Sequence, residues 1–153
     1  AEPQLFHPGD LDYIHSVERI SKFSNVISIN GGVQLDLMGQ ENAESTGTRQ
    51  LSGVGGQMDF LEGAYRSKGG KGFICINSSR VTKDGERKSN ILATIPGGST
   101  ISAPRTMIQY VATEYGIASL SGKTLRERAE AMASIAHPDF REELMKYAQE
   151  NFK

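Results

Sequence analysis

Three glycines within four residues mark the segment best suited to chemistry. Gly53, Gly55 and Gly56 follow Ser52 and lead directly into a helix-like stretch that begins at Gln57. Glycines let a backbone turn sharply and approach a ligand, and the free amides at a helix start bind phosphates, carboxylates or a developing oxyanion. The pattern therefore favours an anion cradle, although a tight turn packed against a neighbouring element explains the glycines equally well.

Two phosphate-binding fingerprints fail in this sequence. The dinucleotide fingerprint needs a glycine where this chain has Met58. The string Ser121-Gly122-Lys123-Thr124 looks like the end of a P-loop, but the first glycine of that motif would fall at Ile117. Gly122 fits better as a turn before a helix, so ATP and NAD are poor candidates for the ligand.

Charged side chains around the glycines supply further candidates. Arg66, Lys68 and Lys71 follow the helix-like stretch and are able to reach a phosphate, although each one singly fits a solvated turn better. Glu114 at a strand end and Glu44 before the glycines are possible acyl-transfer nucleophiles. A surface or structural role is favoured for both carboxylates.

Histidine and cysteine usage argues against a metal site and a hydrolase triad. His7, His15 and His137 are far apart and show no metal-ligand spacing, and no serine lies in a G-x-S-x-G elbow. His137 precedes a proline and is expected to serve a helix junction.

The sequence has one cysteine, Cys75, so an internal disulfide is excluded, and a single cysteine fits a cytoplasmic location. Cys75 lies within an apolar run and is interpreted as a small buried hydrophobe.

The whole chain has the composition of one soluble globular domain. It contains 153 residues, of which 37% are hydrophobic and 23% charged. The net charge of −1 gives no reason to expect nucleic acid or an acidic membrane as a partner. No apolar segment approaches the ~18 residues of a membrane helix, and Ala1–Gln4 do not resemble the start of a signal peptide.

The elements that must position these residues alternate between strands and helices. Residues 25–30 and 33–38 read as two strands joined in a hairpin by the pair Gly31-Gly32. Further short strands are expected over residues 72–77, 91–95 and 107–113, and a helix over residues 57–66.

Two helices are expected to close the chain. Thr124 and Glu127 form a capping box at the start of the first, and Pro138 occupies a favoured first-turn position in the second. Short strands interleaved with helices predict an α/β domain with an open mixed sheet and flanking helices.

Five strings, in matching order and spacing, resemble the acetyl-CoA hydrolase/transferase family, which includes 4-hydroxybutyrate and butyrate:acetate CoA-transferases. The similarity runs from about Phe6 to the end of the chain. The strings are SGVGGQMDF (52–60), RSKGGK (66–71), VATEYGIA (111–118), GKTLRERA (122–129) and IAHPDFR (135–141).

The resemblance implies that residues 1–153 are the C-terminal domain of a longer enzyme. Family members are several hundred residues long and have two similar α/β domains. Their nucleophile is a glutamate upstream of the glycine loop that becomes a glutamyl-CoA thioester, and no equivalent motif stands in residues 1–50. The implied partners are that N-terminal domain, an acyl-CoA and a small carboxylic acid. The full-length form is expected to be a homo-oligomer, and the fragment alone to be inactive.

The same resemblance assigns roles to individual residues. An amide near Gly56 would stabilise the oxyanion, while Ser52, Gly53, Gly55 and Gly56 would contact the thioester or pantetheine end of coenzyme A. Lys68 would approach the CoA phosphates or pantetheine, and no metal is implied. Acyl-CoA hydrolysis and non-catalytic CoA binding remain open as alternatives to CoA transfer.

Overall fold

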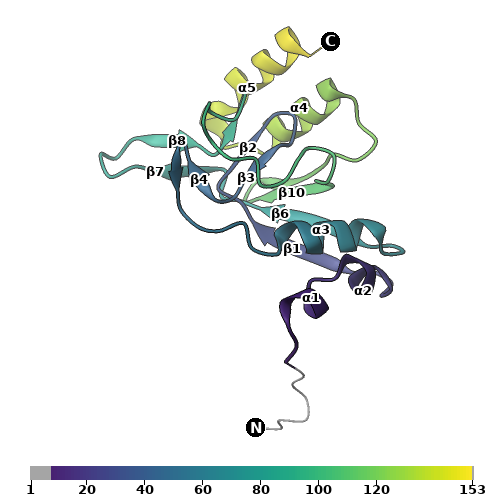
Figure 1. Cartoon of the computed structure of the whole chain (residues 1–153). Helices are drawn as coiled ribbons and strands as arrows, with labels where there is room; N and C mark the ends of the chain where they lie inside the picture. The colour runs from purple at the N-terminus through teal and green to yellow at the C-terminus, as the bar shows by residue number, and fades with distance from the viewer. Residues whose placement is uncertain (1–7, 153) are drawn as a thin grey trace.

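The computed structural model describes residues 8–152 and has the expected α/β architecture, with mixed sheets flanked by helices (Figure 1). His7 and Ala1–Gln4 lie outside the described residues. The helices are α1 (Leu11–Ile14), α2 (Val17–Ser21), α3 (Gln57–Arg66), α4 (Leu125–Ser134) and α5 (Pro138–Asn151). None of the helices within residues 8–152 has the length and apolar character needed to cross a membrane.

The main sheet has four strands in the order β1-β6-β10-β11. Its strands are β1 (Ile27–Gly31), β6 (Lys71–Cys75), β10 (Tyr110–Thr113) and β11 (Gly116–Ser119). The first three are parallel and β11 is antiparallel to β10. Helix α3 is the crossover between β1 and β6, so it runs back along the strands it connects.

Shorter strands form three smaller sheets. One has the order β3-β2-β9, and the other two are the pairs β4-β5 and β7-β8. Their bounds are β2 (Gln34–Asp36), β3 (Glu41–Asn42), β4 (Ser45–Thr46), β5 (Arg49–Gln50), β7 (Ser79–Val81), β8 (Arg87–Ser89) and β9 (Ile91–Leu92).

The predicted hairpin across Gly31-Gly32 is wrong, because β1 and β2 lie in different sheets. β1 pairs with β6, whereas β2 pairs with β3 and β9. All three residues of β2 are buried, so its alternating pattern does not mark a half-exposed strand. Gly32 lets neighbouring side chains pack close to the backbone, and its φ is not positive. A Cβ there would lie 2.8 Å from Glu41 Oε1 and 3.1 Å from Ile74.

The predictions for the helices are confirmed. Helix α3 spans the expected residues 57–66. Thr124 and Glu127 make both hydrogen bonds of the capping box at the start of α4, and Pro138 lies in the first turn of α5. Figure 1 shows α4 and α5 at one end of the molecule and α1 and α2 at the other, with the strands between them.

The two faces of the main sheet differ in burial. Ile74, Val111 and Ala118 are almost fully buried against the helices. The strand register places a second apolar set on the opposite face, which we call the exposed sheet face; its members are Ile27, Ile29, Phe73, Cys75, Tyr110 and Ile117. Ile29 is 69% exposed and Ile117 64%. The expectation that Cys75 is buried is wrong, because it lies on this face and is exposed.

Candidate functional site

Helix α3 presents the glycine loop, residues 52–56, at the carboxyl edge of the main sheet. The opposite end of α3 lies at the amino edge, where Asn25 N donates to Lys68 O at 2.8 Å and Lys71 N donates to Val26 O at 2.8 Å. Because α3 runs antiparallel to β1 and β6, its first turn lies where those strands end. Ligands of open α/β sheets bind outside this edge.

The first turn of α3 has free hydrogen-bonding capacity. Its N-cap is Gly56, which has no side chain to accept from the helix amides, and Gly55 takes a φ of 61°. The other helices within residues 8–152 have side-chain caps, which are Asp10, Ser16, Thr124 and His137. An uncapped helix start leaves amides and the positive end of the helix dipole for an anion.

A buried polar cluster fixes the segment that leads into the loop. The Asn42 side chain accepts from Ser45 N at 2.9 Å and donates to Ser45 O at 2.8 Å. The backbone carbonyl of Glu44 accepts from Leu51 N at 2.7 Å and from Ser52 N at 3.3 Å. Glu44 therefore holds the start of the glycine loop through its backbone.

A cavity of about 420 Å³ lies at the same edge, and we call it the carboxyl-edge pocket. Its lining residues are Gly32, Cys75, Ile76, Asn77, Ala112, Thr113 and Glu114. Cys75 belongs to the exposed sheet face and Ala112 is its register partner on β10, so the pocket opens onto that face. The pocket combines apolar walls with polar groups at the strand ends, as small-molecule sites do.

Glu114 is held rigidly at the rim of the carboxyl-edge pocket. Its two carboxylate oxygens accept from Ser78 N at 2.9 Å and from Ser78 Oγ at 2.6 Å. Desolvation acts to raise the pKa of Glu114, but the hydrogen bonds from Ser78 outweigh it and the pKa is lowered. A carboxylate kept ionised in this way is suited to orient a neighbouring group.

Glu41 links the carboxyl-edge pocket to the glycine loop. Its Oε1 lies against Gly32, which lines the pocket, and its Oε2 accepts from the side-chain amide of Gln57 in the first turn of α3. The sequence offered no signal for this contact, because Glu41 stands in a polar stretch that reads as a loop. Its burial is decided by the packing of β3 against β2.

His15 lies directly over the glycine loop. A Cβ added at Gly56 would meet His15 Cε1 at 2.0 Å, so only glycine fits beneath the imidazole. The ring packs edge-on against Phe60 at 5.0 Å, and its Nδ1 lies 3.4 Å from Asp59 Oδ2. Sequence reasoning missed this contact because His15 is remote along the chain and belongs to no motif.

The structure brings Ser52, Gly53, Gly55 and Gly56 together but places Lys68 elsewhere. Lys68 follows the C-terminus of α3 and lines a separate pocket with Asn25. The ten residues of α3 put roughly 15 Å between the two ends. Lys68 therefore does not share the first turn of α3, and its contact with CoA stays a prediction.

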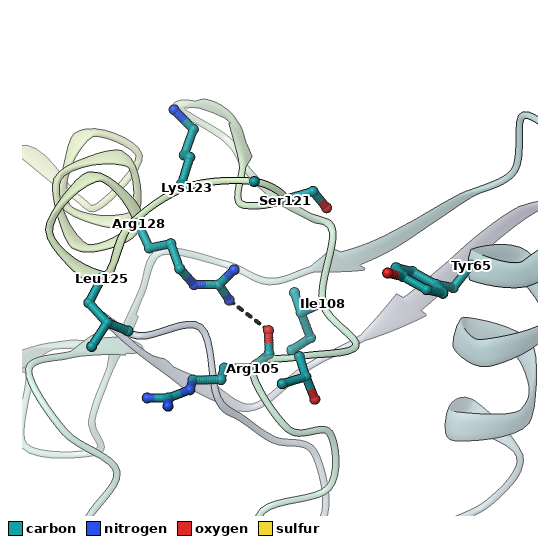
Figure 2. Close-up of a pocket in the computed structure, with 9 residues that line it drawn as sticks. Tyr65, Arg105, Ile108, Ser121, Lys123, Leu125 and Arg128 are labelled. Atoms are coloured by element: carbon teal, nitrogen blue, oxygen red, sulfur yellow. Dashed lines mark hydrogen bonds between the residues drawn. The ribbon is translucent and has the colours of Figure 1, made fainter.

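A second cavity, of about 300 Å³, is lined by no residue of the glycine loop. Arg128 reaches into it from α4 and donates to the carbonyl oxygens of Met38, Leu120 and Arg105, each at 2.8 Å. Figure 2 shows the guanidinium of Arg105 and the Lys123 side chain directed away from Arg128. Arg128 thus ties three backbone segments together.

Comparison with known proteins gives one consistent result. Residues 3–148 match the model of the acetyl-CoA hydrolase/transferase C-terminal domain. A 4-hydroxybutyrate coenzyme A transferase of Clostridium kluyveri is 48% identical and a butyryl-CoA:acetate CoA-transferase of Anaerostipes caccae is 47% identical, over 93% and 91% of this chain. An acetyl-CoA hydrolase of Kluyveromyces lactis is 32% identical over 80% of this chain and 22% of its own.

Solved structures agree in fold. The RipA structure from Yersinia pestis superposes with a TM-score of 0.79 at 39% identity, covering 91% of this chain and 30% of its own. The chain spans about a third of the length of the CoA-transferases that it resembles, 32% for the Clostridium enzyme and 31% for the Anaerostipes enzyme.

Proposed function

The chain belongs to the acetyl-CoA hydrolase/transferase family, as its C-terminal domain, and from this premise we propose that it supplies the CoA-binding half of a CoA-transferase active site. The observation that carries the proposal is the uncapped, glycine-rich start of α3 beside the carboxyl-edge pocket. The ligand is an acyl-CoA thioester, and the acceptor is a small carboxylic acid.

The chemistry assigned to the glycine loop is stabilisation of negative charge. A carboxylate nucleophile attacks the thioester carbonyl, and the carbonyl oxygen takes up the electron pair as the tetrahedral centre forms. An amide at Gly56 donates to that oxygen until the C–S bond breaks and the thiolate leaves. Oxyanion donors in comparable sites lower the barrier by about 3–4 kcal/mol. Ser52, Gly53 and Gly55 contact the adjacent thioester or pantetheine.

The nucleophile belongs, in this proposal, to an N-terminal domain that docks on the exposed sheet face. That face is apolar, and the carboxyl-edge pocket opens onto it. A domain that covers the face would also close the pocket and exclude water from the thioester. The proposal includes a cytoplasmic location in acyl-CoA metabolism, which the single cysteine fits.

Two assays test the proposal. The 153-residue chain alone should show no CoA transfer between acyl-CoA and acetate. Joined to the N-terminal segment of the Anaerostipes relative, it should transfer CoA and give a borohydride-trapped glutamyl thioester on that segment. Robust transfer by the chain alone, with the thioester trapped on Glu44 or Glu114, would contradict the assignment of the nucleophile to the N-terminal domain.

Hydrolysis is the second candidate function, because two relatives, from Kluyveromyces lactis and Candida albicans, are named acetyl-CoA hydrolase. Thiol release by the joined protein, measured with and without a carboxylate acceptor, separates the two. Transfer passes CoA from one acyl group to another and frees no thiol, so formation of the acceptor's CoA thioester without thiol release supports transfer. Thiol release that does not need the acceptor supports hydrolysis.

A further inference from the structure

Glu41 is a buried carboxyl group that the proposed reaction does not use. The residue has no exposed surface, and its Oε2 accepts from the side-chain amide of Gln57. Its Oε1 is also buried and has no hydrogen-bond partner within residues 8–152. A buried polar atom without a partner is uncommon in a native fold and calls for an explanation.

Hydrogen bonds hold the backbone of Glu41 in place beside α3. Glu41 N donates to Ala103 O at 3.0 Å, and Glu41 O accepts from Ser102 N at 2.8 Å. Strand β3 also pairs with β2. Gly32 packs against the carboxyl group, with room for no side chain of its own. Glu41 therefore has a fixed backbone position in the small sheet, and its side chain contacts the first turn of α3.

We propose that Glu41 is a positioning residue, which through Gln57 fixes the first turn of α3 and so sets the glycine-loop amides for the CoA thioester. The inference rests on the proposed function of the loop. Because Gln57 directly follows Gly56, a displacement of its side chain moves the helix start that carries the oxyanion donor.

The charge state of Glu41 suits this role. Burial raises the pKa of Glu41 to about 8, against the opposing effect of the hydrogen bond from Gln57. At pH 7 the carboxyl is therefore mostly protonated, and it holds Gln57 while placing little negative charge behind a loop that receives an anion. Within residues 8–152, the titratable groups that face the same helix turn are His15, from the segment before α2, and Asp59, from α3 itself.

Nuclear magnetic resonance of the ¹⁵N-labelled chain tests the positioning role. Between pH 6 and 9.5, the amide signals of Gly53, Gly55 and Gly56 should shift with a midpoint near 8. The variant E41Q keeps the shape and the hydrogen-bonding groups but cannot ionise, so this transition should vanish. The variant H15Q should retain it, which separates Glu41 from the imidazole. A transition near pH 8 that persists in E41Q, or its absence from the wild-type chain, overturns the proposal.

Calorimetric titration with CoA separates this inference from the proposed function. Wild-type affinity should fall at least tenfold between pH 7 and 9, whereas the affinity of E41Q should stay level over the same range. Equal pH dependence in both proteins contradicts the role of Glu41. If the wild-type chain binds no CoA at any pH, the proposed function of the isolated chain fails, while the resonance experiment still decides the role of Glu41.

Discussion

Gly56 shows at the residue scale how closely the loop and its surroundings are fitted. An alanine there would place its Cβ 2.0 Å from the His15 ring, so we expect G56A to destabilise the fold by about 1–3 kcal/mol. Gly97 is the matched control, because a Cβ there meets nothing within 4 Å. Urea unfolding measures both. The double variant H15A/G56A should regain most of the loss, and equal stability of G56A and G97A would refute the contact.

Glu41 gives a second residue-scale prediction, for stability against pH. Its pKa is raised by burial from 4.5 in the unfolded chain to about 8 in the fold. Between pH 4.5 and 8 the folded state therefore keeps a proton that the unfolded state has lost. The contribution of protonated Glu41 to the free energy of unfolding is complete below pH 4.5 and is lost as the pH rises to 8. The loss amounts to up to about 5 kcal/mol.

The glutamine variant isolates that contribution. The free energy of unfolding of the wild-type chain minus that of E41Q should fall between pH 5 and pH 8 and level off above pH 8. Chemical unfolding at several pH values measures it. A difference that stays constant with pH would show that Glu41 ionises alike in the folded and unfolded chains.

At the scale of elements, sequence patterns predicted the features that contacts between near neighbours in the chain determine. The capping box at Thr124 and the span of α3 follow from contacts within one turn, and both are confirmed. The strand pairing after Gly31 depends on partners far along the chain, β6 and β9, which no local pattern specifies. The surroundings of Glu41 and His15 were missed for the same reason, so the loop itself could be predicted but not the groups that hold it.

Helix α4 gives a prediction about long-range anchoring. Replacing Arg128 by alanine leaves three carbonyl oxygens without their donor, so we expect a loss of about 3 kcal/mol in stability. Within residues 8–152, the partner of Arg126 on the same helix is Glu130, in a solvent-exposed pair, and R126A should change stability by no more than about 0.5 kcal/mol. Urea unfolding compares the two. Similar losses would show that the three carbonyls do not depend on Arg128.

At the scale of the whole molecule, the exposed sheet face is the surface we propose for docking. A four-stranded sheet with one apolar face uncovered favours a partner, and we propose the N-terminal domain. The double variant I29K/I117K should fold normally, because both side chains are exposed, and should weaken binding of that domain at least tenfold. Val81, 59% exposed on the β7-β8 hairpin, is the control as V81K. Sedimentation with the separate domain measures binding, and undiminished binding by I29K/I117K would place the contact elsewhere.

Alkylation of Cys75 can report whether a domain is docked on the exposed sheet face. The chain has one thiol, and it stands on β6 beside the carboxyl-edge pocket. Alkylation by a maleimide therefore gives a single-site footprint without any engineered label. Its rate should be that of an open thiol in the isolated chain and should drop when a docked domain shields the strand. The oxidation chemistry of this residue would then depend on whether the protein is assembled.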